Sequence, residues 1–215
     1  MNKIYERRWL RFAKVEKMKY IGHLDLQTIF HGAIRRAKLP IAYSQGFNPH
    51  QRISFALPLP VGMESLCEYV ELILEESADV TVLDKHLPGG LRILETYKVS
   101  EKAPRPAAEV AAVDYRLTGI NKGLAKNTYD SITSAPKIVV LKKTKSGEKE
   151  VDIKPDILDI ACDHIGTLTM RLSAGSAKNL SPQVIIKEFF PQENISIIRT
   201  EMYASNARPL HEIIL

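Results

Sequence analysis

The chain has 215 residues, of which 45% are hydrophobic and 26% are charged, and this composition excludes disordered and collagen-like classes of protein. Its two cysteines, Cys67 and Cys162, cannot form a zinc ribbon or a three-cysteine iron–sulfur site. The N-terminal residues are charged, and no segment reaches the ~20 apolar residues of a membrane span. We therefore expect a cytoplasmic protein with reduced cysteines and no membrane partner.

The net charge of +5 is unevenly distributed along the chain. Residues 1–55 contain eleven Lys and Arg residues and three acidic residues, a net charge of +8, whereas residues 56–100 have a net charge of −5. A basic segment of this kind either forms an ordinary solvated surface or attracts a polyanion such as RNA. The charge pattern leaves both interpretations open.

Strand and helix patterns alternate through the first half of the chain. The clearest is a helix over residues 23–37, where apolar residues recur on one arc, Asp25 lies in the first turn and Pro40 follows the end. The other predicted elements are a strand at 9–15, a turn at 17–22, short strands at 41–43 and 53–57, a strand at 68–74, a short helix at 79–87 and a strand at 91–99. This order matches a ferredoxin-like βαββαβ unit.

The second half shows a similar order of elements after a proline-rich linker at residues 102–108. The predicted elements are a strand at 110–117, a helix at 122–134, strands at 137–143 and 149–153 joined by a turn at Lys145–Glu148, a strand at 167–172, a helix at 182–190 and a strand at 195–203. Residues 156–163 fit either a strand or a turn of helix. The fold expected is therefore α+β, with two tandem ferredoxin-like domains at residues 1–101 and 109–215.

The polar loop Ser44–Arg52 is the densest group of binding side chains in the sequence. Gly46 permits unusual backbone angles and Asn48-Pro49 favours a turn, so the loop should project its side chains in a fixed arrangement. Its amide, ring, imidazole and guanidinium groups are typical of sites for single-stranded nucleic acid or a phosphate-bearing ligand. The alternative is a packed loop with a buried Phe47. The candidate binding residues are Gln45, Phe47, Asn48, His50 and Arg52.

His23 stands at the start of the first predicted helix, within the motif Gly22-His23-Leu24-Asp25. A histidine there can act as a general acid or base, or it can simply cap the helix. His31 lies eight residues further on, about 12 Å along a helix, which is too far for one metal ion to join the two imidazoles. We therefore expect no metal site and no cofactor, and His23 is kept as the catalytic alternative.

Further candidate ligand residues lie outside the loop. Glu64 either accepts hydrogen bonds from a bound base or belongs to a structural connection. Charged residues of the last strand either pair with one another or line a groove. The remaining candidates for RNA contact are His23, Arg35, Arg36, Arg199, Tyr203 and Arg208.

One long stretch carries a family resemblance. It reads GHLDLQTIFHGAIRRAKLPIAYSQGFNPHQRISFALPLPVGMES and is followed by EYVELIL. It closely resembles the radical-SAM-linked protein family of bacteria, a family without an established function whose members occur beside or fused to a radical-SAM protein. The resemblance implies a radical-SAM partner that carries the iron–sulfur cluster. The family pattern commonly has proline where this chain has Gln51.

These observations predict a non-catalytic accessory protein that binds substrate RNA for a radical-SAM modification enzyme. A first alternative is a metal-independent ribonuclease-like enzyme that uses His23. Such RNA-processing enzymes are built from tandem ferredoxin-like domains, but their C-terminal glycine-rich loop is missing here. A second alternative is an adaptor for a small molecule or a protein.

Overall fold

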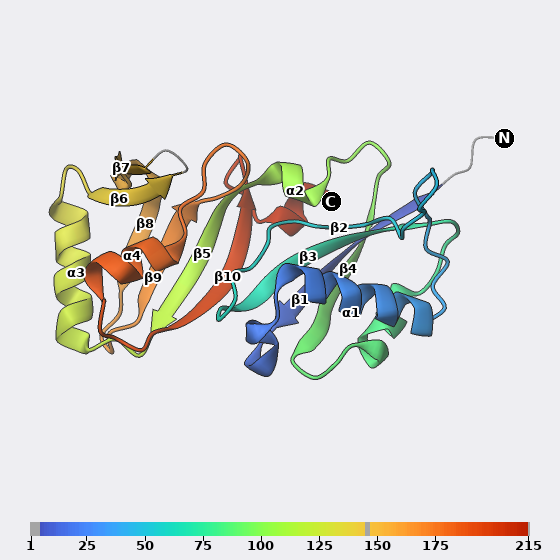
Figure 1. Cartoon of the computed structure of the whole chain (residues 1–215), viewed down its shortest axis with the longest axis horizontal. Helices are drawn as coiled ribbons and strands as arrows, with labels where there is room; N and C mark the ends of the chain where they lie inside the picture. Colours follow the sequence, from blue (N-terminus) through green and yellow to red (C-terminus); the bar gives the residue numbers. More distant parts are fainter. Residues whose placement is uncertain (1–4, 145–146, 215) are drawn as a thin grey trace. The chain divides into compact units, whose positions relative to one another are not determined.

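The computed structural model describes residues 5–144 and 147–214 and divides into two compact units (Figure 1). Unit 1 comprises Met1–Val110 and Met202–Leu215, and unit 2 comprises Ala111–Glu201. Both units combine helices with antiparallel strand pairs, which confirms the α+β class. No helix in the described part of the chain is long and apolar enough to cross a membrane.

The sheet of unit 1 has β1 and β3 at its centre. β1 pairs with both β3 and β4. Val70 and Leu72 of β3 pair with β1 and also with β2, so β3 lies between these two strands and the order is β4-β1-β3-β2. The elements are β1 (Glu6–Lys14), η1 (Glu16–Tyr20), α1 (His23–Arg36), β2 (Ile53–Phe55), β3 (Glu64–Leu74), η2 (Val80–His86), β4 (Leu91–Val99), α2 (Pro106–Glu109) and η4 (Leu210–Ile214).

The apolar core of unit 1 lies between this sheet and the layer formed by α1 and η2 (Figure 1). Three aromatic rings form its middle, with Phe30 4.9 Å from Phe12 and 5.3 Å from Phe55 between ring centroids. Burying a side chain of this kind contributes roughly 1.5–3 kcal/mol. Other fully buried members are Leu10, Ile34, Val70, Leu72, Leu74 and Leu83.

Helix α1 follows the sequence prediction closely because its pattern is strong. Leu26, Phe30 and Ile34 are buried, as one face of an amphipathic helix requires. The helix ends at Arg36, one residue earlier than predicted, and Lys38 then adopts a left-handed conformation with φ of 53°. This turn leads the chain back towards the sheet edge, where Ile41 forms an isolated bridge with Leu74.

The sheet of unit 2 has the order β10-β5-β9-β8. β10 contributes its first six residues, up to Glu201, to this unit. The hairpin of β6 and β7 forms a separate two-stranded sheet, and Lys145 and Ser146 of its predicted turn lie outside the described residues. The elements are β5 (Val110–Thr118), α3 (Lys122–Ser134), β6 (Val139–Thr144), β7 (Gly147–Asp152), η3 (Lys154–Asp156), β8 (Ile157–Cys162), β9 (Leu168–Ser173), α4 (Pro182–Phe189) and β10 (Ser196–Ala204).

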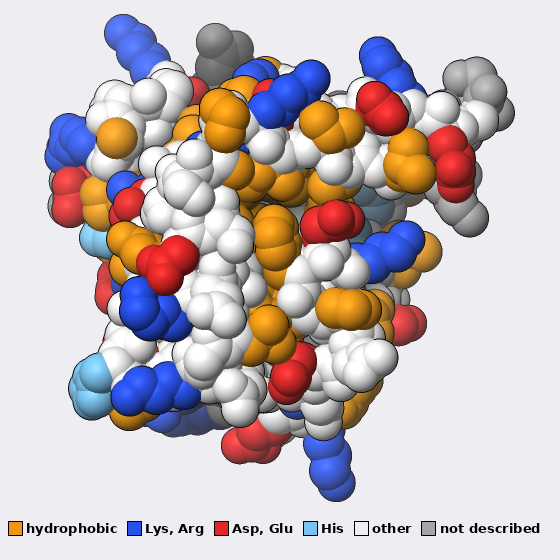
Figure 2. Space-filling model, turned by 90° about the vertical axis from the view of Figure 1, so that its left-hand side faces the viewer, with side chains coloured by type: hydrophobic (Ala, Val, Ile, Leu, Met, Phe, Trp, Pro, Cys, Tyr) orange, Lys and Arg blue, Asp and Glu red, His pale blue; other side chains and the backbone are white. Residues whose placement is uncertain are grey.

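Unit 2 also contains an apolar cavity of about 250 Å³ between its hairpin and α4. Figure 2 views the molecule from the side that carries α3 and β6, and hydrophobic side chains gather there among polar ones. Leu141 of β6 is 64% exposed. The hydrophobic residues that line the cavity are Val140, Leu141, Val151, Ile153, Leu180 and Val184.

Two predicted elements take a different form in the structure. The segment predicted as a helix at 79–87 is the 3-10 helix η2, which Asp79 caps by accepting a hydrogen bond from the backbone N–H of Thr81. The segment predicted as a strand at 41–43 forms only isolated bridges, one of which joins Tyr43 to Gln51. That bridge closes the polar loop at its base.

Candidate functional site

The polar loop is closed by hydrogen bonds between its two ends. The backbone N–H of Ser44 donates to the carbonyl of His50 at 2.9 Å, and the backbone N–H of His50 donates to Oγ of Ser44 at 3.1 Å. Gly46 has a φ of +120°, a conformation that residues with a side chain rarely adopt. The two hydrogen bonds between Ser44 and His50 therefore hold the ends of the loop together below its tip.

Phe47 stands at the tip of this loop with its ring fully exposed, at 106% of the reference accessibility. This excludes the alternative of a packed loop with a buried Phe47. Gln45, Asn48 and His50 are exposed as well. The structure therefore presents an apolar ring to solvent, surrounded by amide and imidazole groups.

Gln51 anchors the end of the loop to α1. Only 6% of Gln51 is exposed, and its Oε1 lies 2.6 Å from Nδ1 of His31. The sequence comparison with the family pattern marked Gln51 as a departure from proline. In this chain the glutamine side chain makes a buried contact that a proline could not make.

A cavity of about 220 Å³ opens beside the loop within unit 1. It has two cationic side chains, Arg52 from the loop and Arg105 from the chain before α2. The guanidinium of Arg52 also lies over the ring of Tyr5, 5.1 Å from its centroid. The polar and charged residues that line the cavity are Ser44, His50, Gln51, Arg52, Ser54, Glu71 and Arg105.

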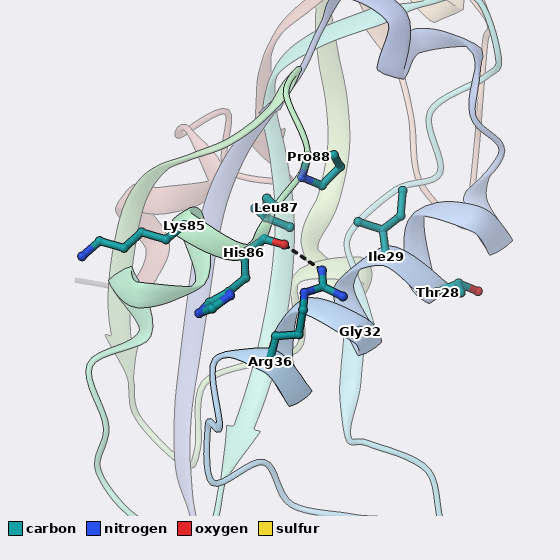
Figure 3. Close-up of a pocket in the computed structure, with 8 residues that line it drawn as sticks. All are labelled: Thr28, Ile29, Gly32, Arg36, Lys85, His86, Leu87 and Pro88. Atoms are coloured by element: carbon teal, nitrogen blue, oxygen red, sulfur yellow. Dashed lines mark hydrogen bonds between the residues drawn. The ribbon is translucent and has the colours of Figure 1, made fainter.

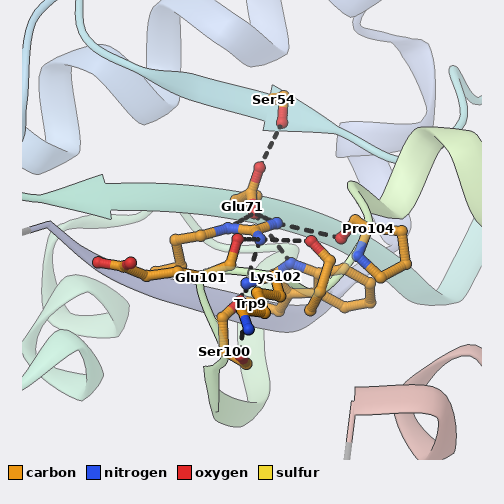
Figure 4. A network of polar contacts seen from close by, with 9 residues as sticks. Trp9, Ser54, Glu71, Ser100, Glu101, Lys102 and Pro104 are labelled. Atoms are coloured by element: carbon orange, nitrogen blue, oxygen red, sulfur yellow. Dashed lines mark hydrogen bonds and ion pairs between the residues drawn. The ribbon is translucent and has the colours of Figure 1, made fainter.

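Glu71 is the acidic residue of this cavity and is 2% exposed (Figure 4). Its Oε1 accepts hydrogen bonds from Nε of Arg7 at 2.8 Å and from the indole N–H of Trp9 at 3.2 Å. Its Oε2 accepts from the hydroxyl of Ser54 at 3.4 Å. The carboxylate is thus buried, paired and held in one orientation.

Arg7 connects Glu71 to the segment that follows β4. Its guanidinium donates to the backbone carbonyls of Ser100, Glu101, Ala103 and Pro104. These bonds hold the segment that leads to Arg105. The sequence prediction missed Arg105 and Glu71, because the first lies in an apparent linker and the second reads as an ordinary strand residue.

His23 and Glu64 make contacts that favour structural roles. The side-chain amide of Gln27 donates to Nε2 of His23 at 3.0 Å, and the imidazole packs edge-on against Phe55. Oε1 of Glu64 accepts from the backbone N–H of Glu16 at 2.9 Å, which joins η1 to β3. Neither residue lines the cavity beside the loop.

Arg35 and Arg36 are exposed at the end of α1, but they do not line the loop cavity. Nη2 of Arg36 donates to the carbonyl of His86 at 2.8 Å, at the end of η2. The structure therefore places Arg36 beside η2. The two arginines also favour the carboxyl end of α1 electrostatically.

The candidates near the C-terminus do not form one exposed face. Arg199 is 1% exposed in unit 2, and its guanidinium contacts the ring of Tyr115 at 5.7 Å. The alternation of burial along β10 shifts by one residue after Arg199, so that Met202 is buried and Tyr203 is half-buried. Arg208 is exposed, and its Nη2 donates to the carbonyl of Glu212 at 2.9 Å. Because Arg199 is buried, its position favours a structural role within unit 2 over contact with a ligand.

The described residues contain no group of three or more His, Cys, Asp or Glu side chains arranged to hold a metal ion. Cys67 is buried in β3 and Cys162 is half-buried at the end of β8. Neither of these two described cysteines forms a disulfide. The side chains that characterise the site beside the loop are Arg52, Arg105, the exposed ring of Phe47 and the buried carboxylate of Glu71.

Comparison with known proteins identifies the family. A family model described as "Uncharacterized protein conserved in bacteria (DUF2344)" matches residues 7–182. No curated protein matches the chain. A solved structure of a "putative glycine cleavage system transcriptional repressor" shares 10% sequence identity with this chain, with a TM-score of 0.29, over 91% of this chain and 99% of that one. Because the family model covers most of the sequence, the chain belongs to this DUF2344 family of conserved bacterial proteins.

Proposed function

We propose that the protein is an accessory RNA-binding protein that presents a substrate RNA to a radical-SAM modification enzyme. The loop tip around Phe47 and the cavity with Arg52 and Arg105 would contact a single-stranded segment. The observation that carries this proposal is the exposed ring of Phe47 on a loop closed at its base.

A fully exposed aromatic ring is available for contact with a ligand. Phe47 has no packing role in the described structure, since its ring is fully exposed. Bases of single-stranded RNA stack on such rings, and each stacked base contributes roughly 1–3 kcal/mol. The amide groups of Gln45 and Asn48 beside the ring can donate to base edges or to phosphate oxygens.

The charges around the loop fit the same ligand. Arg52 and Arg105 reach the cavity from two separate segments, and His50 lines the same cavity. Guanidinium groups bind phosphate oxygens with two parallel hydrogen bonds, which makes them suited to an RNA backbone. Glu71 at the same cavity is already engaged with Arg7, Trp9 and Ser54, so the ligand contacts are assigned to the arginines.

We also propose that each of the two units has a ferredoxin-like fold. In unit 1 the strand order β4-β1-β3-β2, with α1 and η2 on one face, is the order of a ferredoxin-like βαββαβ unit. In unit 2 the strands β10-β5-β9-β8 have the same relation to α3 and α4 if the β6–β7 hairpin is an insertion. These orders support the proposal of two ferredoxin-like domains.

The proposed partner follows from the resemblance and from the cysteine count. A radical-SAM enzyme needs three cysteines close together for its cluster, and this chain contains two, of which Cys67 is buried. The radical chemistry would therefore belong to the partner protein. Copurification of a tagged chain from its own cells tests this part: recovery of a radical-SAM protein is expected, and its consistent absence would contradict the partnership.

RNA binding is tested by fluorescence anisotropy with a labelled single-stranded RNA. We expect Phe47→Ala to lower the affinity about tenfold or more, because a stacked base is lost. Leu24→Ala is the matched control, since Leu24 is an exposed apolar side chain of the same unit, 75% exposed, away from the loop. Absence of binding by the unmodified chain, or an equal loss in both variants, would contradict the proposal.

The two alternatives give different results in the same assay. A ribonuclease that uses His23 would cleave the RNA, and His23→Ala would stop cleavage while leaving binding unchanged. An adaptor for a protein or a small molecule would bind no RNA at any salt concentration. The contacts of His23 with Gln27 and Phe55 favour the non-catalytic role.

A further inference from the structure

A second and larger cavity of unit 1 lies on α1, with a volume of about 410 Å³ (Figure 3). It is an open groove between α1 and the end of η2, and we call it the α1–η2 groove. It shares no lining residue with the cavity beside the loop. The residues that line it are Thr28, Ile29, Gly32, Arg36, Lys85, His86, Leu87 and Pro88.

The charge of the α1–η2 groove is entirely basic. Arg36 comes from α1, whereas Lys85 and His86 come from η2. None of the eight described residues that line the groove is acidic. The nearby Asp84 is engaged elsewhere, because its Oδ1 accepts from the backbone N–H of Ile93 at 2.7 Å. A groove with this charge is suited to an anion.

Among the described residues, the guanidinium of Arg36 has one hydrogen-bond partner. Its Nη2 donates to the carbonyl of His86 at 2.8 Å, as the dashed line in Figure 3 shows. A guanidinium has five N–H donors. This bond therefore fixes the position of the group and leaves further donors for a ligand.

Gly32 makes room for this arrangement. A Cβ atom at Gly32 would lie 3.1 Å from Nη1 of Arg36, which is tighter than ordinary contact. Glycine in the middle of a helix is less favourable than alanine by about 1 kcal/mol. With alanine at this position the guanidinium of Arg36 would have to shift by a few tenths of an ångström.

We propose that the α1–η2 groove binds the phosphate group of a ligand, with Arg36 as its anchor. Arg36 would bind two phosphate oxygens, and the exposed side chain of Lys85, which Figure 3 shows directed away from Arg36, would turn towards the bound phosphate. The apolar side chains of Ile29, Leu87 and Pro88 would shield these contacts from water on one side. This proposal does not depend on RNA binding by the loop.

Pyrophosphate is the probe for the first arm of the test. Titration of the ¹⁵N-labelled full chain, followed by NMR at the backbone amide of Gly32, should give saturable shifts. Arg36→Ala should lower the affinity about tenfold, because a charge-assisted contact is lost. Arg35→Ala is the matched control, since it removes the same charge one residue earlier, outside the groove.

A second variant separates binding from folding. Arg36→Ala also removes the bond to the carbonyl of His86, which joins α1 to η2. Lys85→Ala leaves this bond in place and should still weaken pyrophosphate binding about threefold. Thermal unfolding of each variant checks that the fold persists.

The second arm uses a short single-stranded RNA to identify the source of the phosphate. Pyrophosphate binding that depends on Arg36 identifies a small phosphorylated ligand. If pyrophosphate does not bind, but Arg36→Ala lowers RNA affinity and Arg35→Ala does not, the phosphate belongs to an RNA backbone. Both results support the groove. No pyrophosphate shift, together with equal RNA affinities for the two variants, would overturn it, and Arg36 would then be a structural tether.

Failure of this proposal can be told apart from failure of the proposed RNA function. Phe47→Ala should reduce RNA affinity and leave pyrophosphate binding unchanged, because Phe47 does not line the α1–η2 groove. Arg36→Ala should reduce pyrophosphate binding whether or not the loop binds RNA. The two variants therefore report on the two sites separately.

Discussion

His31 of α1 and Gln51 of the polar loop lie 2.6 Å apart, between Nδ1 and Oε1, and Gln51 is almost fully buried. This contact joins the end of a loop with an exposed tip to a helix packed on the core. The base of the loop is therefore attached to α1. Restraining the base of a loop reduces the entropy that the loop loses when a ligand binds.

The first prediction concerns this contact. Gln51→Ala should destabilise unit 1 by about 1–3 kcal/mol, because the ring nitrogen of His31 loses its buried partner. RNA affinity should fall as well, since the loop base loosens. Urea unfolding and fluorescence anisotropy measure the two effects, and Gln45→Ala, at an exposed position, is the control for stability. Equal stability of both variants would show that the contact contributes nothing.

The second prediction concerns the buried ion pair of Arg7 and Glu71, whose closest atoms are 2.5 Å apart. Glu71→Ala leaves the guanidinium of Arg7 buried without its carboxylate, and the expected loss of stability is about 3–5 kcal/mol. Lys126→Ala, which removes one partner of the exposed ion pair with Asp130, should cost much less. Chemical unfolding of the two variants makes the comparison.

Arg7 supports a third prediction, about the segment after β4. Its guanidinium donates to the carbonyls of Ser100, Glu101 and Pro104. Arg7→Lys keeps the charge but loses the forked geometry, so protease cleavage within residues 100–105 should become faster than in the unmodified chain. Cleavage at an unchanged rate would show that other contacts hold this segment.

The fourth prediction is a pH dependence at Glu6. Burial acts to raise the pKa of Glu6, but hydrogen bonds from Lys98, Arg8 and Ser77 lower the pKa below its ordinary value of 4.5. Because the folded pKa is the lower one, the stabilisation is present above the ordinary value and is lost as pH falls through the folded value.

Glu6→Gln should therefore lower the melting temperature at neutral pH, by an amount that corresponds to roughly 0.5–1 kcal/mol. The difference from the unmodified chain should shrink at an acidic pH below the folded pKa of Glu6. Thermal unfolding at both pH values measures it, with the exposed Glu101→Gln as control. A difference that persists unchanged at low pH would show that the carboxylate charge is not its cause.

The fold was predictable where the sequence pattern is local. The period of apolar residues placed α1 to within a residue at its end, and clean alternation located most of β3 and β4. Strand β8 was not predictable, because its residues are mostly exposed or half-buried and so lack the alternation of a strand with one buried face. Its pairing with β9 is a tertiary contact that no local pattern records.

The candidate site was predictable only in part. The loop residues stand together in the sequence, so their glycine, proline and polar side chains were enough to mark them. Arg105 and Glu71 reach the same cavity from distant segments, and their convergence depends on strand pairing and on the bonds of Arg7. The sequence predicted that Arg199 contacts a ligand, but its side chain is buried. The period-two pattern of the sequence did not show which face of β10 is buried, and the alternation of buried residues shifts by one residue after Arg199.

The most direct test of the central claim uses Phe47→Trp. The native Trp9 is fully buried, so the introduced indole can be recognised by the red-shifted emission of an exposed ring. If bases stack on the loop tip, single-stranded RNA should quench this emission with saturation, and the affinity should match that of the unmodified chain. RNA that binds without changing this emission would contradict the account, because Phe47 would then lie outside the contact.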